Sequence, residues 1–256
     1  MRETLSSKKP LIIVITIGLV VITALLIYGI LVTPARQPYR DALAQYNNTN
    51  AALSRTNVSL NAGGASDEEF EKGLEAVKAS FVSLDTENKA LSKTTVLTDG
   101  EGKALYVKYD KDLKAYATYN TNVLESMKKV RPVLHSCSAA MDEVTVDAQG
   151  AGVIRACADK MQAATDVPDE DYKKLAEDFQ KSYAELATIL EQMASISDKN
   201  SAEYQQLSEQ RSEIVNNFSE ASTAFSKSVQ AKRKAILSTS SANDLKVYLE
   251  EKSRVF

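Results

Sequence analysis

The segment from Leu11 to Val32 contains no charged side chain, and it limits what this chain can fold into more than any other feature. A helix rises about 1.5 Å per residue, so this one would be roughly 33 Å long and could cross a hydrocarbon core of about 30 Å once. The apolar core of a cleaved secretory signal is shorter, usually about 7 to 15 residues. We therefore predict an uncleaved transmembrane signal-anchor helix over 11–32, with cleavage after Ala35 as the alternative.

The basic residues around this segment predict its orientation. Lys and Arg are enriched on the cytoplasmic side of a span, and the first span usually dominates the topology. Three basic residues precede the segment, while Arg36 and Arg40 follow it. We expect a short cytoplasmic tail over 1–10 and an extracytoplasmic domain over 33–256, at the cell membrane.

The composition favours a helical domain outside the membrane. The chain has nine Gly, five Pro and no Trp, and it is rich in Ala, Leu, Ser, Lys and Glu, which argues against a sandwich or a barrel. Its formal net charge is −3 at pH 7, with both signs interspersed. This charge argues against nucleic acid as a partner, because such partners require a basic surface.

Apolar residues recur at alternating spacings of four and three, which is the pattern of a heptad seam. The clearest seam consists of Phe70, Leu74, Val77, Phe81, Leu84, Asn88 and Leu91. Ser66 and Glu69 precede it as a capping box, a common helix start. We predict an all-α fold, with the membrane helix followed by an elongated antiparallel helical bundle that has coiled-coil-like seams.

The same patterns predict the other helices. They cover about 38–60, 103–130, 166–196, 201–237 and 243–254, and the first has a seam of Tyr39, Leu43, Tyr46, Asn50, Leu53, Asn57 and Leu60. Pro132 should end or kink the helix before it. Between 134 and 164 we predict two short helical pieces, interrupted over 145–152 by β-branched residues and glycines. The short turn at 197–200 favours antiparallel neighbours.

The two cysteines, Cys137 and Cys157, predict a disulfide. Both lie in the part expected outside the membrane, where an even number of cysteines usually pairs. Closing a loop of this length would stabilise the fold by about 3 kcal/mol in the chain-entropy model. The alternative is two separate buried thiols.

Four tyrosines stand close together between residues 106 and 119, the densest aromatic cluster outside the predicted membrane segment. They are Tyr106, Tyr109, Tyr116 and Tyr119. Tyr combines a large apolar area with a polar tip, so these rings could line a ligand cleft or a protein interface. The alternative is packing in the core and at its boundary.

No sequence pattern points to catalysis. His135 is the single histidine, so a metal site or a nucleophile with a histidine base would depend on it alone, and we expect it to lie partly exposed at a helix end. The paired carboxylates at 67–69 and 169–171 fall in first helical turns, where they complement the helix dipole. We expect no metal, no cofactor and no enzymatic activity.

These features together predict a membrane-anchored extracytoplasmic protein that acts by binding, scaffolding or cell-surface interaction. Its expected partners are the lipid bilayer, through residues 11–32, and a protein at the cell surface or in the membrane. The composition suggests a bacterial surface protein. One alternative is a module that binds a small molecule or a cell-wall fragment and relays the signal through a membrane partner. Another is an enzyme whose carboxylates converge only in the folded chain.

Overall fold

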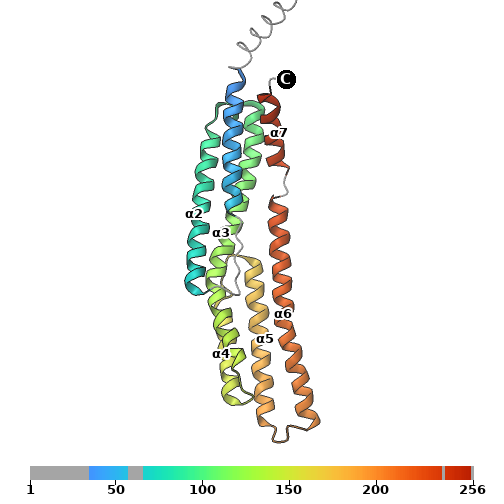
Figure 1. The fold of residues 1–256 in the computed structure, drawn as a ribbon. Helices are drawn as coiled ribbons and strands as arrows, with labels where there is room; N and C mark the ends of the chain where they lie inside the picture. The colour runs from blue at the N-terminus through green and yellow to red at the C-terminus, as the bar shows by residue number, and fades with distance from the viewer. Residues whose placement is uncertain (1–34, 57–65, 238–239, 255–256) are drawn as a thin grey trace, which may run out of the picture. The chain divides into compact units, whose positions relative to one another are not determined.

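A computed structural model describes residues 35–56, 66–237 and 240–254 (Figure 1). In these ranges every regular element is a helix, as predicted. After a helix over residues 35–55, the order is α2 (Asp67–Ser92), η1 (Thr95–Leu97), α3 (Gly100–Asp142), α4 (Ala148–Ala163), α5 (Glu170–Ser195), α6 (Ala202–Leu237) and α7 (Ser241–Ser253).

The described residues form two compact units. Unit 1 contains residues 35–56, 80–110 and 240–254, and unit 2 contains 66–79 and 111–237. The helices α2 and α3 each contribute one part to unit 1 and the other part to unit 2.

The predicted membrane segment, 11–32, lies outside the described residues. Among the helices that the structure describes, none is both long and apolar enough to cross a membrane.

Unit 1 has two tyrosine rings in contact in its core. The rings of Tyr46 and Tyr109 are buried, with centroids 5.5 Å apart. The Tyr46 hydroxyl donates a hydrogen bond of 2.9 Å to the carbonyl of Ala242, which joins the helix over 35–55 to α7. Leu245 and Leu249 of α7 are fully buried, so α7 is part of this core.

The predicted seam of the helix over 35–55 is wrong by one residue along much of its length. Ala42, Thr49 and Thr56 are buried, whereas Asn50 is exposed. The Thr49 hydroxyl donates to the carbonyl of Gln45 at 3.0 Å, which satisfies this buried polar group within its own helix. Small side chains therefore form this face, and a search for large apolar residues misses it.

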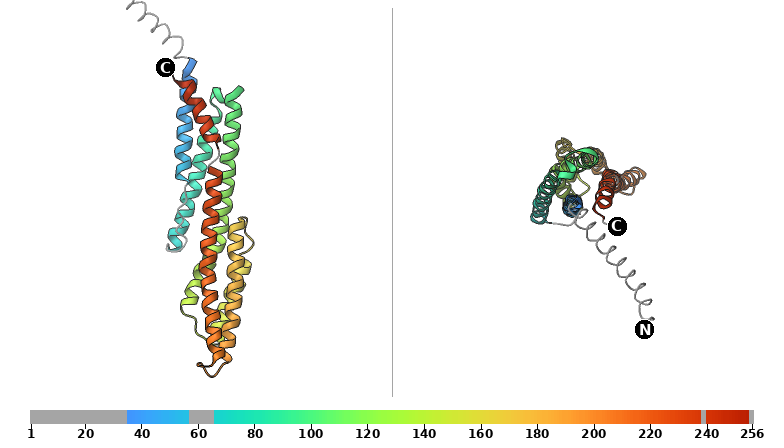
Figure 2. Two further views of the ribbon diagram at one scale, coloured as in Figure 1. Left: turned by 90° about the vertical axis from the view of Figure 1, so that its right-hand side faces the viewer. Right: turned by 90° about the horizontal axis from the view of Figure 1, so that it is seen from above.

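Unit 2 is built on α5, which packs against both α4 and α6. The largest fully buried side chains here include Ile154 and Met161 of α4, and Leu186 and Leu190 of α5. Figure 2 shows α5 and α6 side by side, and the turn that joins them makes them antiparallel, as predicted.

The helix α2 begins at the predicted capping box. The Ser66 amide donates to a carboxylate oxygen of Glu69 at 3.0 Å, and the Glu69 amide donates to the Ser66 hydroxyl at 3.3 Å. Phe70, Leu74, Leu84 and Leu91 of the predicted seam are buried. The reciprocal bonds satisfy two backbone groups that a helix start leaves without a helical partner.

The helix expected over 103–130 continues through Pro132 to Asp142 as α3, so of the two predicted alternatives, an end or a kink, the end is wrong. A proline inside a helix removes one backbone hydrogen bond and costs about 3 kcal/mol. Tertiary contacts around the proline offset this cost: Val130 and Arg131 are buried next to it, and so is Cys137 one turn and a half later.

The predicted interruption of the helices over 145–152 is also longer than the break in the structure. The break is confined to residues 143–147, and α4 begins at Ala148. Asp147 caps α4 by accepting a hydrogen bond of 2.7 Å from the Gly150 amide. A β-carbon on Gly150 would lie 2.0 Å from the carbonyl oxygen of Thr145, so this glycine permits the close turn before the helix.

Candidate functional site: an aromatic cleft in unit 2

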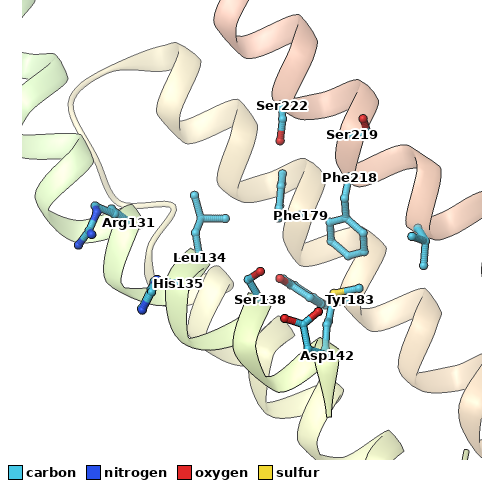
Figure 3. Close-up of a pocket in the computed structure, with 12 residues that line it drawn as sticks. Arg131, Leu134, His135, Ser138, Asp142, Phe179, Tyr183, Phe218, Ser219 and Ser222 are labelled. Atoms are coloured by element: carbon cyan, nitrogen blue, oxygen red, sulfur yellow. The ribbon is translucent and has the colours of Figure 1, made fainter. Parts of the chain in front are cut away.

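Three helices of unit 2 line a cleft with a volume of about 540 Å³ (Figure 3). Pockets that hold small molecules typically measure about 300–1,000 Å³. The cleft is lined by Arg131, Leu134, His135, Ser138, Met141 and Asp142 of α3, Phe179 and Tyr183 of α5, and Val215, Phe218, Ser219 and Ser222 of α6. Its size and its mainly apolar lining fit a ligand-binding site.

Three packed aromatic side chains give the cleft its apolar character. Phe179 and Tyr183 lie four residues apart on α5 and therefore share a face. The ring of Phe218 lies 4.9 Å from that of Phe179 and 4.7 Å from that of Tyr183, centroid to centroid. Burial raises the pKa of the Tyr183 hydroxyl to about 12, so this phenol stays neutral at pH 7.

The walls on either side combine apolar and hydroxyl groups. Residues that line the cleft recur at spacings of four and three on each wall: Leu134, Ser138 and Met141 on α3, and Val215, Ser219 and Ser222 on α6. Such spacing places side chains on one helix face. Val215 is 42% exposed, which leaves apolar surface available to a ligand.

Arg131 forms an ion pair with a residue that does not line the cleft. Its side chain is 3% exposed, and its guanidinium donates to Asp67 at 2.7 Å. The same guanidinium lies over the Phe70 ring, 4.2 Å from its centroid. Arg131 therefore fixes the first turn of α2 against α3, and the Asp67 carboxylate balances its charge.

Asp142 has a different environment at the last residue of α3. Its carboxylate is exposed and makes no ion pair or hydrogen bond with any residue that the structure describes. Figure 3 shows Ser138, Asp142 and Tyr183 gathered in one part of the cleft. His135 is exposed and lies two turns before the end of α3, so the prediction that it stands at a helix end is wrong.

The predicted disulfide supports the α3 wall. Cys137 of α3 and Cys157 of α4 are paired, with their α-carbons 5.7 Å apart. Both side chains are buried, and Cys137 directly precedes Ser138 of the cleft. The bond therefore holds the end of α3 against α4, and α4 packs on α5 below the cleft.

Two of the four predicted tyrosines belong to unit 1. Tyr106 is half-buried and donates to the side-chain oxygen of Asn88 at 3.2 Å. Burial and the nearby Asp110 carboxylate raise its pKa to about 12. Tyr109 is buried against Tyr46, and burial also raises its pKa.

The other two tyrosines belong to unit 2. Tyr116 is buried, and the half-buried Tyr119 donates a long hydrogen bond of 3.5 Å to the carbonyl of Val229 in α6. None of the four tyrosines lines the aromatic cleft. A ligand or interface role for them stays a prediction, and they do not contribute to the site described here.

The start of α5 holds a second polar cluster, which ties helices together. Asp169 caps α5 by accepting from the Tyr172 amide at 3.0 Å, and its own amide donates to the Ser126 hydroxyl at 2.9 Å. Asp171 accepts from Ser228 at 2.9 Å and pairs with Lys232 at 2.8 Å. These bonds link α5 to α3 and α6.

The described part of the chain contains no group of three or more His, Cys, Asp or Glu side chains placed to hold a metal ion. Within the cleft, the titratable groups are Arg131, His135, Asp142 and Tyr183. Arg131 is paired, and Tyr183 is a neutral phenol at pH 7. The other two groups, His135 and Asp142, both lie on α3.

The sequence predicted the helices that carry the aromatic residues of the cleft but not the full α3 wall. Phe179 and Phe218 lie in the helices expected over 166–196 and 201–237, whereas Ser138, Met141 and Asp142 lie beyond the helix expected over 103–130. No protein-family model, no curated protein and no solved structure matches this chain.

Proposed function

We propose that this chain is a non-catalytic binding protein, attached to a membrane by residues 11–32, whose aromatic cleft in unit 2 takes a small ligand with an apolar body. The observation that carries the proposal is the cleft of about 540 Å³ over Phe179, Tyr183 and Phe218. Rigid helices and a disulfide support its walls, so little ordering is required on binding. The serine hydroxyls at its edges would orient polar groups on the ligand.

A matched pair of substitutions on α6 tests this proposal. Ser219→Trp places a large ring in the cleft, whereas Ser226→Trp places the same ring on an exposed position of α6 that does not line it. The full chain in lipid nanodiscs would be titrated with para-fluorobenzyl alcohol, and binding followed by ¹⁹F NMR. Empty nanodiscs measure partition of the probe into lipid.

We expect saturable binding to the unmodified chain and to Ser226→Trp, and at least a tenfold loss in Ser219→Trp. Equal binding to both variants, or no saturable binding beyond lipid partition, would contradict a ligand site in this cleft.

The topology of the proposed tether has its own test. Tags at Met1 and Phe256 would be probed with protease on intact cells. Loss of the C-terminal tag alone supports an external domain. Loss of the tag at Met1 alone contradicts the proposed orientation. If both tags are protected from protease until the cells are lysed, either an outer barrier shields the domain or the domain is inverted. Lysis of the outer barrier alone distinguishes these two explanations.

A further inference from the structure

We propose that the aromatic cleft selects organic cations: ligands that carry a positive charge, such as an ammonium group, on an apolar body. This inference rests on the proposed function and specifies the chemical class of its ligand. It follows from the charges that line the cleft and from the rings at its centre.

The cleft contains an exposed carboxylate, that of Asp142, which has no described partner. The other permanently charged side chain in its lining is that of Arg131. The Arg131 guanidinium is paired with Asp67 at 2.7 Å. The exposed Asp142 carboxylate makes no ion pair or hydrogen bond with the described residues, so it is available to a ligand.

The aromatic rings of the cleft also favour a cation. The face of an aromatic ring carries partial negative charge and attracts cations that lie within about 6 Å of its centre. Phe179, Tyr183 and Phe218 all line the cleft, and Figure 3 shows Asp142 close to Tyr183 in the same region. Because burial raises the pKa of Tyr183 to about 12, its hydroxyl stays neutral at pH 7 and adds no charge of its own to the cleft.

A compact organic cation fits both features better than a metal ion does. The described residues offer no cluster of three metal ligands, whereas the apolar walls would cover the body of an organic ligand. A neutral ligand of equal size would use the walls and rings but leave Asp142 without a partner. An anionic ligand would be repelled by the Asp142 carboxylate.

Three probes that share one aromatic body test this selectivity. They are para-fluorobenzyl-trimethylammonium, para-fluorobenzyl alcohol and para-fluorophenylmethanesulfonate, titrated by ¹⁹F NMR against the full chain in nanodiscs of zwitterionic lipid. We expect the cation to bind at least fivefold more tightly than the alcohol, and the anion to bind least tightly. The preference should shrink as salt is raised, because ions screen exposed charges.

Asp142→Asn tests the source of the preference, with Glu143→Gln as the matched control. Glu143 is the next residue, is also exposed and does not line the cleft. We expect Asp142→Asn to abolish the preference for the cation over the alcohol, and Glu143→Gln to retain it. Asp142→Glu, which keeps the charge, should retain most of it.

The outcomes separate this inference from the proposed function. If the alcohol does not bind saturably, or binds Ser219→Trp as well as the unmodified chain, the proposed function fails. If the alcohol binds in the cleft but the cation is not preferred, or the preference survives Asp142→Asn, only the selectivity is overturned.

Discussion

Gly150 and Gly152 lie two residues apart at the start of α4 but have different surroundings. A β-carbon on Gly150 would lie 2.0 Å from the Thr145 carbonyl oxygen, whereas one on Gly152 would meet nothing within 4 Å. Glycine inside a helix costs about 0.5–1 kcal/mol relative to alanine when the space for a side chain is free. The two positions therefore separate a glycine that the fold requires from one that it tolerates.

We expect Gly150→Ala to destabilise the fold by about 1–3 kcal/mol, because the turn before α4 must move. Gly152→Ala should instead leave the free energy of unfolding unchanged or raise it by up to about 1 kcal/mol. Urea unfolding of the full chain, followed by circular dichroism, measures both. Equal effects of the two substitutions would show that the close contact at Gly150 does not constrain the turn.

The residue scale also shows where sequence reasoning was reliable. The capping box at Ser66 and Glu69 was predicted from two side chains and is present, because capping depends on neighbours in sequence. The ion pair between Arg131 and Asp67 was not predictable in the same way, because the two residues are distant in sequence. Whether the Asp142 carboxylate is available to a ligand depends in turn on whether another side chain pairs with it in the folded chain.

At the scale of elements, the path of α3 through Pro132 decides whether the cleft exists. Without the continuation to Asp142, the chain would lack the wall that Leu134, Ser138 and Met141 provide. The proline rule predicted an end or a kink there, and the helix continues because tertiary packing offsets the cost of the proline. A single sequence gives no direct signal for that packing.

Pro132→Ala should stabilise the chain if this account of α3 is right. Alanine restores the backbone donor that proline lacks, and Pro132 is exposed, so little packing is lost. Greater freedom of the unfolded chain offsets part of the gain. We expect an increase of about 1–2 kcal/mol in the free energy of unfolding from urea titrations. A decrease would mean that the native conformation at this position depends on the proline ring.

The disulfide between α3 and α4 should contribute to stability and to the cleft. It closes a separation of 20 residues, for which the chain-entropy model gives about 3 kcal/mol. We expect the double substitution Cys137→Ser and Cys157→Ser to lower the free energy of unfolding by about 2–4 kcal/mol. Electrophoresis of the unmodified chain should show different mobility with and without reductant. Two thiols that label freely in the oxidised protein would contradict the pairing.

For the whole molecule, the buried tyrosines predict how stability depends on alkaline pH. The pKa of Tyr183 is raised to about 12 in the fold, compared with about 10 in an unfolded chain. Below pH 10 both states keep the proton, so stability does not depend on this group. Between about pH 10 and 12 the unfolded chain releases the proton first, and the free energy of unfolding falls as pH rises.

Urea unfolding at steps between pH 9 and 12 measures this dependence, and Tyr183→Phe isolates the contribution of one residue. We expect the variant to show a shallower fall above pH 10, while the other tyrosines whose pKa values are raised, among them Tyr106, Tyr109 and Tyr119, sustain the remainder. An unchanged slope in Tyr183→Phe would indicate that its hydroxyl is accessible to water in the folded chain.

The general architecture of the described residues was predictable from the sequence, because heptad spacing, caps and turns act locally. The all-helical class, the antiparallel pair α5 and α6, and the cysteine pair all follow from such signals. The division into two units and the cleft in unit 2 depend on contacts between distant residues. The tyrosine cluster illustrates the difference, since residues close in sequence fall into separate units.

The most direct test of the central claim, that the aromatic cleft binds a ligand, is methyl NMR of the methionines. Met141 lines the cleft, whereas Met161 and Met193 are buried elsewhere in unit 2. With ¹³C-labelled methyl groups and saturating para-fluorobenzyl alcohol, we predict a selective shift of the Met141 signal, assigned through Met141→Leu. A Met141 signal that stays unchanged under saturating probe, or that shifts no more than those of Met161 and Met193, would contradict the claim.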